Sequence, residues 1–248
     1  MTYNWIAALA FVGTLVASTL ALRAMVWKVT EFTELRSQNK EADKKKMSRE
    51  YFRNAVKQSN QSGLWTNVGF YITILPFTVG FGARPWWQHL VEIAAVLLIF
   101  DFMYYLTHRF IFHGDLLRKV HALHHQARTP TYIDSLYVHP LETFIGLSLF
   151  LLSIPIVSLI AGQPMNPFSA AMATLAFTQL NTVNHAWTNL EGKTQAGPLA
   201  PLFRTVDYIT GVHASHHIDM SHGNYATLTM MYDKAFGTFE EPTRRATP

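Results

Sequence analysis

The stretch AVLLIFDFMYYLTHRFIFHGDLLRKVHALHH, residues 95–125, runs from an apolar segment directly into five histidines. Its first half is apolar enough for a membrane helix, since crossing about 30 Å of hydrocarbon takes roughly 20 helical residues. Its second half carries imidazoles, which are common metal ligands. The stretch therefore predicts membrane helices that end at a metal-binding region.

Further apolar stretches lie on both sides of this one. The 248-residue chain is 49% hydrophobic and only 15% charged, whereas soluble domains usually carry about a quarter charged residues. We predict an all-α integral-membrane helical bundle of about five spans with a cytosolic histidine-rich helical cap that holds a dinuclear metal site. The expected spans are 3–26, 64–82, 88–107, 141–161 and 167–187.

The distribution of charge predicts the orientation of these spans. Nine of the twenty Lys and Arg residues lie between Lys28 and Lys57, and the 162–166 turn has none. Basic loops stay in the cytoplasm, which places the 108–140 segment and the tail after residue 187 there too. The rest of the chain is near neutral, so we expect a membrane surface and no nucleic acid as partner.

Two segments follow from this organisation. Residues 1–63 are predicted to be an N-terminal membrane anchor and a basic cytosolic segment, and residues 64–248 a catalytic domain. The first span lacks a basic start and a cleavage site, so it is interpreted as a retained anchor. Residues 28–62 are predicted to be a solvated amphipathic helix or a mobile loop near anionic headgroups.

Four groups of histidines carry the chemical information. They are His108 with His113, an HxxHH motif at His121, His124 and His125, the single His185, and a second HxxHH motif at His213, His216 and His217. On a helix, positions i, i+3 and i+4 share a face, so each HxxHH motif is expected to aim three imidazoles in one direction. His108 and His113 lie about 140° apart on an ideal helix, so they serve different ions or the helix is distorted between them.

The number of histidines predicts two metal ions. A structural zinc ion takes four ligands and a catalytic one three, so nine histidines are too many for one ion. Imidazole suits iron, zinc, copper and nickel alike, which leaves the metal open. The chain has no cysteine, which excludes thiolate and iron–sulfur sites. It also lacks the HExxH motif of zinc proteases and the GxGxxG motif of dinucleotide binding.

Polar residues near the histidines are candidates for supporting roles. Asp101 lies two turns before His108 near the end of an apolar span, where a carboxylate is costly. We expect it to accept the second ring N–H of a ligand histidine, or else to bond a neighbouring helix. Glu142, Asp219 and Asp233 are weaker candidates of the same kind. Asn184, with Asn181, shares a helical face with His185 and lines a polar mouth or bonds neighbouring helices.

These motifs together resemble the fatty acid hydroxylase/sterol desaturase superfamily of integral-membrane di-iron oxygenases. The resemblance runs from about Asp101 to Phe239. Its motifs are DxxYYxxHR from Asp101, HxxHH from His121, HPxE from His139, Asn184-His185, HxxHH from His213, Asn224-Tyr225, and DxxFGT from Asp233. Two positions depart from the family pattern, because Asn189 replaces a histidine and Ala226 replaces a glycine.

The resemblance implies a function and a ligand set. It implies an O2-dependent hydroxylase or desaturase acting on an unactivated C–H bond of a membrane lipid, with two iron ions, which zinc can replace in purified protein. Electrons would come from an external reductase or small redox protein. A transmembrane metal-ion transporter is the alternative. The implied iron ligands are His108, His113, His121, His124, His125, His185, His213, His216 and His217, while His139 and His222 are expected beside the ligands or facing the substrate.

Overall fold

The computed structural model describes residues 2–26, 28–188, 197–218 and 220–242, and in these residues the fold is all-α, as predicted. Among the described residues, Val79 and Met165 form an isolated parallel β-bridge. The α-helices are α1 (Trp5–Val26), α2 (Thr30–Met47), α3 (Glu50–Thr73), α4 (Leu75–Thr78), α5 (Trp86–Thr107), α6 (Arg118–His121), α7 (Pro140–Ile160), α8 (Pro167–Asn184), α9 (Ala200–His216) and α10 (Met231–Ala235). A π-helix, η1 (His108–Phe112), continues α5, and short 3₁₀ helices η2 (His124–Gln126) and η3 (Tyr132–Leu136) follow.

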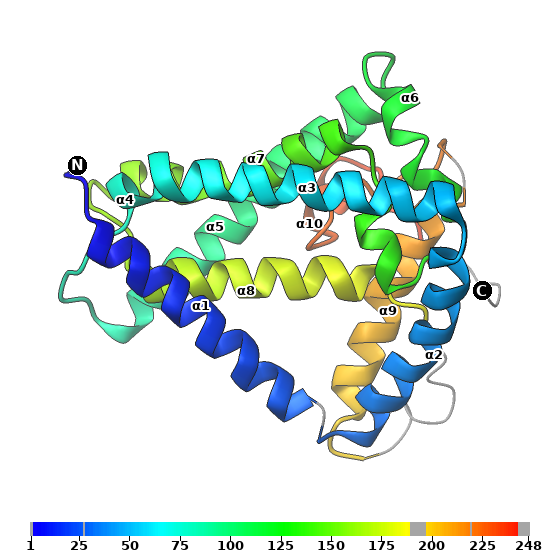
Figure 1. Cartoon of the computed structure of the whole chain (residues 1–248), viewed down its shortest axis with the longest axis horizontal. Helices are drawn as coiled ribbons and strands as arrows, with labels where there is room; N and C mark the ends of the chain where they lie inside the picture. The colour runs from blue at the N-terminus through cyan, green and yellow to red at the C-terminus, as the bar shows by residue number, and fades with distance from the viewer. Residues whose placement is uncertain (1, 27, 189–196, 219, 243–248) are drawn as a thin grey trace.

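Five long helices build one half of the molecule. Figure 1 shows α3 running along α7, with α8 beneath them and α1 crossing α8. Their shared core is apolar. Phe150 and Phe177 stack in it with ring centroids 4.0 Å apart, and Phe100 packs edge to face against both rings. Side chains cap the N-termini of α7 and α8. His139 Nδ1 accepts from Leu141 N–H at the start of α7, and Asn166 Oδ1 accepts from Phe168 N–H at the start of α8.

Three of the described helices are long and apolar enough to cross a membrane. They cover Trp5–Val26, Trp86–Phe112 and Pro140–Ile160, and they overlap the expected spans 3–26, 88–107 and 141–161. Exposed aromatic side chains lie at the start of two of them, where Trp5 and Trp86 are 59% and 75% exposed. Helices that are apolar all round, with such exposed faces, are typical of a membrane protein.

The other two expected spans differ from the structure. The 64–82 span was wrong in its bounds, because α3 begins at Glu50, ends at Thr73 and gives way to the short α4 at Pro76. Pro76 lacks the N–H that would continue the hydrogen bonds of α3, and it lies instead in the first turn of α4, where that N–H is not needed. Helix α8 occupies 167–184 of the expected 167–187 span. Neither α3 nor α8 is among the three candidate spans, so the total of five stays a prediction.

The basic segment is not merely solvated. Helix α2 buries Leu35 and Asn39, and the Asn39 side chain forms two hydrogen bonds to the backbone of Trp187, as donor to its carbonyl at 2.8 Å and as acceptor from its N–H at 2.9 Å. Helix α3 buries Phe52 against Tyr137, with stacked rings 4.1 Å apart. Of the two alternatives expected at 28–62, the amphipathic helix is present, in α2 and in the first part of α3, and its inner face is docked rather than solvated. Helix α3 continues unbroken across the expected boundary at residue 63.

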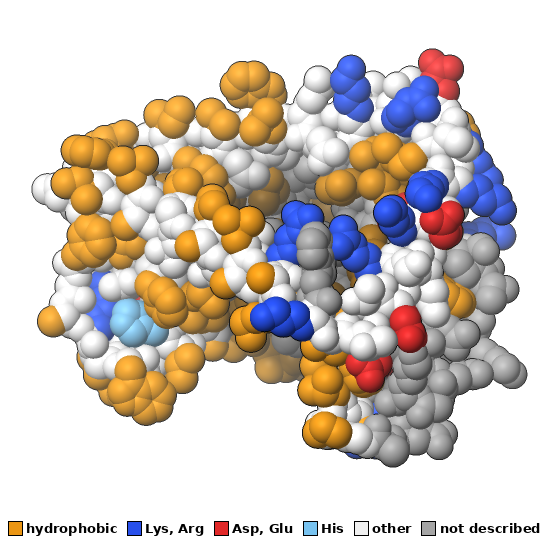
Figure 2. Space-filling model, turned by 60° about the horizontal axis from the view of Figure 1, so that its bottom comes forward, with side chains coloured by type: hydrophobic (Ala, Val, Ile, Leu, Met, Phe, Trp, Pro, Cys, Tyr) orange, Lys and Arg blue, Asp and Glu red, His pale blue; other side chains and the backbone are white. Residues whose placement is uncertain are grey.

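The surface divides into an apolar part and a charged part. In Figure 2 hydrophobic side chains cover most of the left half, whereas Lys and Arg gather on the right half. The right-hand end in Figure 1 holds α2, α6 and α9, together with the start of α3. Apolar helices thus lead to a polar end built by the histidine-bearing segments and the basic helix α2.

Candidate metal centre

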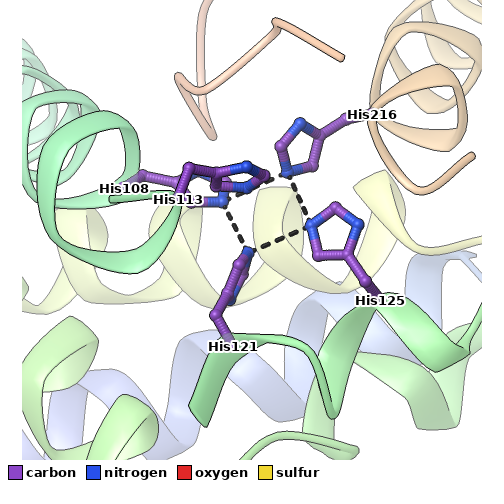
Figure 3. Close-up of side chains that lie close together, drawn as sticks. All are labelled: His108, His113, His121, His125 and His216. Carbon is purple, nitrogen blue, oxygen red and sulfur yellow. Dashed lines mark hydrogen bonds between the residues drawn. The ribbon is translucent and has the colours of Figure 1, made fainter. Parts of the chain in front are cut away.

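The nine predicted ligand histidines form two buried groups. One group holds His108, His113, His121, His125 and His216, and the other holds His124, His185, His213 and His217. Within each group the ligand atoms all lie within 4.8 Å of one another. Figure 3 shows the five-histidine group, whose rings converge from α5–η1, from the segment around α6 and from α9.

A π-helical turn brings His108 and His113 into the same group. The N–H of His113 donates to the carbonyl of His108 at 2.9 Å, an i→i+5 bond. A π-turn holds more residues than an α-turn, so residues five apart stack on one face, and such turns are frequent at functional sites. The sequence left open two ions or a distorted helix, and the structure has the distorted helix.

The HxxHH motifs do not each aim at one ion, and that expectation was wrong. In the first motif His121 and His125 join the five-histidine group, whereas His124 joins the other. The second motif divides in the opposite way. His213 and His217 belong to the four-histidine group, and His216 belongs to the five-histidine group. Residues at i and i+4 share a group, while the residue at i+3 turns to the neighbouring one. Each motif therefore ties the two groups together.

Hydrogen bonds from Nδ1 to backbone carbonyls fix the tautomers of five of the nine histidines. A carbonyl can only accept, so Nδ1 carries the proton in these rings. The pairs are His108 with Tyr225 at 2.7 Å, His113 with Met220 at 3.0 Å, His124 with Tyr137 at 3.3 Å, His185 with Asn181 at 2.8 Å and His216 with Gly223 at 2.6 Å. In each of these five rings Nε2 is therefore unprotonated and carries a free lone pair.

These lone pairs crowd together, which indicates a cation. Four Nε2 atoms form a closed ring with neighbours 3.0–3.2 Å apart, drawn as dashed lines in Figure 3, through His108, His121, His125 and His216. The His113 ring lies 4.8–5.0 Å from all four of these rings, and its buried Nε2 has no hydrogen-bond partner. A square of this edge places its centre about 2.2 Å from each nitrogen, close to the length of a metal–imidazole bond.

The second group has the same character with four ligands. Its Nε2 atoms follow one another at 3.0–3.2 Å from His124 through His185 and His213 to His217. The donor set of both groups therefore fits metal ions. Burial lowers the pKa of His121 to about 3 and the pKa values of His113 and His124 to about 4. These imidazoles are neutral at pH 7, as metal ligation requires.

Glu142 is the carboxylate that supports a ligand. Its Oε1 accepts from Nδ1 of His121 at 2.8 Å, and both side chains are buried. A carboxylate behind a ligand imidazole fixes the tautomer and raises the basicity of the ring. The sequence signal was the HPxE motif, because its proline starts α7 and its glutamate comes two residues later, on the first turn facing the cluster.

The role expected for Asp101 was wrong, because this carboxylate contacts no ligand histidine among the described residues. It accepts instead from three consecutive backbone N–H groups of Thr227, Leu228 and Thr229, at 2.8–3.1 Å, and from the Thr229 hydroxyl. A buried carboxylate is stabilised by several N–H donors, and this loop supplies them. Asp101 thus forms hydrogen bonds to a loop, whereas the alternative expected from the sequence was a bond to a neighbouring helix.

The same loop supplies carbonyls to the histidines. Asp233 accepts from the N–H groups of Tyr225 and Ala226, each at 2.8 Å, and Asn224 adopts a left-handed backbone with φ of 61°. Gly223 has no room for a side chain, because a Cβ there would lie 2.0 Å from the carbonyl oxygen of Thr238. Asp101 and Asp233 thus orient His108 and His216 indirectly, through the loop carbonyls. Sequence reasoning missed this indirect role.

The remaining candidates lie outside the two groups. His139 is exposed and caps α7. His222 Nδ1 donates to Glu240 Oε2 at 2.5 Å, and the Asn184 amide donates to the carbonyl of Thr227. His139 and His222 are therefore not ligands in the described arrangement. Asn189 and Asp219 lie outside the described residues.

A cavity of about 380 Å³ leads to both groups. Histidines His108, His124, His185 and His213 line one end, while Phe100, Leu147 and Phe177 belong to the apolar core of the long helices. Helices α3, α5, α7 and α8 form its walls. The cavity therefore connects the apolar core of the long helices with both histidine groups.

Comparison with known proteins agrees with this geometry. The family model described as Fatty acid hydroxylase matches residues 93–238. Methylsterol monooxygenase 1 of Rattus norvegicus is 28% identical over 156 residues, which covers 62% of this chain and 48% of that protein. Very-long-chain aldehyde decarbonylase CER1 of Arabidopsis thaliana is 27% identical over 185 residues, which covers 73% of this chain and 28% of that protein. The chain thus spans less than half of either relative, and no solved structure matches it.

Proposed function

The chain belongs to the fatty acid hydroxylase family, and from that premise we propose that it is a membrane-bound di-iron enzyme that uses O2 to oxidise a C–H bond of a lipid. The observation that carries the proposal is the cavity, because it joins an apolar chamber among the long helices to both histidine groups. The names of the relatives, a sterol monooxygenase and a long-chain aldehyde decarbonylase, also support a lipid as substrate.

Different residues would bind the metal ions, orient the lipid and hold the protons of the ligand histidines. The five-histidine group would hold one iron ion and the four-histidine group the other. When bound, the two ions would supply the redox chemistry that activates O2 for attack on an unactivated C–H bond. The cavity wall orients the lipid chain and excludes water from its reacting carbon. Glu142 holds the proton on Nδ1 of His121, and the carbonyls of Tyr225 and Gly223 do the same for His108 and His216.

Hydroxylation and desaturation both need an external electron donor. In hydroxylation one oxygen atom of O2 enters the lipid and the other becomes water, whereas in desaturation both become water. Each reaction takes two electrons from the lipid, and the other two electrons, with two protons, must be supplied. The chain carries no dinucleotide-binding GxGxxG motif. We therefore propose that a separate reductase or small redox protein docks at the polar end of the molecule.

We also propose that the metal centre faces the cytoplasm, and this orientation predicts a labelling pattern. The exposed positions Ser37 on α2 and Gln163 after α7 should lie on opposite sides of the membrane. Because the chain has no cysteine, Ser37→Cys and Gln163→Cys each introduce a single reactive thiol. An impermeant maleimide should label Gln163→Cys in intact cells and Ser37→Cys only after permeabilisation. Labelling of both in intact cells would contradict this topology.

The proposed activity predicts oxygen uptake coupled to a lipid product. Iron-loaded protein in vesicles made from host lipids, supplied with a chemical reductant, should consume O2 and yield an oxidised or desaturated lipid detected by mass spectrometry. Anaerobic vesicles and vesicles with His216→Ala serve as controls. Accumulation of iron or zinc inside the vesicles without any oxygen-dependent lipid product would instead identify a transporter.

A further inference from the structure

A second groove adjoins the cavity, and its charges point to the substrate class. Resting on the proposed function, we propose that the substrate is an amphiphile with an anionic headgroup, bound by Arg53 and Lys57 on α3 while its chain enters the cavity. The groove lies at the end of the molecule where α2 meets α3. Its lining residues are Met47, Arg53, Val56, Lys57, Asn60, Gln61 and Leu64.

The groove and the cavity are continuous along α3. Asn60 and Leu64, one turn apart, line both of them. On the groove side the lining continues to Val56 and Arg53, and on the cavity side it continues to Gly63 and Asn67. A chain that follows this face of α3 passes from the polar end of the molecule to the histidines without leaving the surface of one helix.

The groove combines an apolar floor with two cations. Val56 is only 3% exposed and packs with Met47 and Tyr137 in a small core, so the floor is firm and apolar. Arg53 and Lys57 are exposed at its edge. This combination suits a molecule whose apolar chain begins directly beside a negative group.

The two cations lack an anionic partner in the described part of the chain. The guanidinium of Arg53 donates to the carbonyl of Met47 at 3.3 Å, and no described ion pair includes Arg53 or Lys57. Like charges at i and i+4 on a helix repel each other. The nearby Lys46, in contrast, is paired with Asp134. A carboxylate or phosphate headgroup would relieve the repulsion and accept charge-assisted hydrogen bonds.

The far end of the cavity limits how deep the chain can reach. Phe100 and Phe177 line that end and pack edge to face at 4.9 Å, and Phe177 stacks on Phe150. With the headgroup held at Arg53 and Lys57, and the tail stopped by these rings, the carbon beside the histidines is set by its distance from the headgroup. The two ends of the channel therefore determine which position of the chain is oxidised.

Photocrosslinking of a charged and an uncharged chain tests the proposal without turnover. The probes are palmitic acid with a diazirine in mid-chain and the methyl ester of the same compound. Full-length protein is placed in zwitterionic phosphatidylcholine nanodiscs, so that bulk lipid does not compete for the cations. The acid should crosslink to the α7 peptide that contains Thr143 and Leu147, and the ester should do so at least about ten-fold less.

Two double variants give the matched comparison. Arg53→Gln with Lys57→Gln should reduce crosslinking of the acid to the level of the ester. Lys40→Gln with Lys45→Gln removes the same charge from exposed positions of α2 outside the groove and should leave crosslinking unchanged.

Three results would overturn the proposal. They are equal crosslinking of acid and ester, no effect of the groove variant, and crosslinks confined to the outer face of α3, which would identify a bulk membrane lipid. The proposed function fails by a different result, namely that the acid binds in the cavity as described but no lipid is oxidised with O2.

Discussion

His216→Ala and His124→Ala should each lower oxygen-dependent lipid oxidation by more than about 100-fold. Loss of a group that merely supports a ligand already costs 10–100-fold, and these two histidines are themselves predicted ligands. They belong to different groups, His216 to the five-histidine group and His124 to the four-histidine group. If the reaction needs both ions, loss of either group is equally damaging.

His139→Ala is the control for this comparison. Like His124 and His216, His139 is a histidine of the motif-bearing region, but its side chain only caps α7. Loss of a helix cap costs about 1 kcal/mol of stability. Its lipid oxidation should stay close to that of the wild type at a temperature where the variant remains folded. If His124→Ala kept half of the activity, the four-histidine group would have no part in catalysis.

Glu142→Gln should weaken the binding of iron by about 10–100-fold. Glutamine has the same shape and can still accept from Nδ1 of His121, but it loses the negative charge that raises the basicity of the ring. The affected ion is the one bound by the five-histidine group, since His121 belongs there. Competition with a chelator of known affinity measures the change in the dissociation constant.

Asp101→Asn separates a specific effect from loss of a buried charge. Asp101 is as buried as Glu142 but binds loop N–H groups rather than a histidine. Its amide should lower the melting temperature and should weaken iron binding much less than Glu142→Gln does, because Asp101 acts on His108 only through the loop. Equal losses of iron affinity in Asp101→Asn and Glu142→Gln would show that the carboxylate of Glu142 has no special role behind His121.

Much of the centre could be predicted from the sequence because its ligands occur in short motifs. The apolar runs before His108 and after His139 predicted α5 and α7, and the nine histidines predicted two metal groups. Spacing alone could not assign each histidine to a group. That assignment depends on the π-turn after α5 and on how η2 and α9 face each other, which tertiary packing decides.

The supporting contacts lie beyond the reach of local patterns. Backbone carbonyls of Tyr225, Met220 and Gly223 orient ligands more than 100 residues away or on another element, and every residue has a carbonyl, so no side-chain type marks them. Asn39 is similar, because its partner Trp187 is 148 residues away. Helix α2, which carries Asn39, is rich in charged residues, so the sequence alone predicts that it is solvated. Its contact with Trp187 is visible only in the folded structure.

The metal content of four purified proteins tests the central claim most directly. Elemental analysis after loading with iron should give two ions per chain in the wild type, one in His216→Ala, one in His124→Ala and none in the double variant, because each histidine belongs to a separate group. One ion per chain in the wild type, or loss of both ions in either single variant, would contradict two sites formed by divided HxxHH motifs.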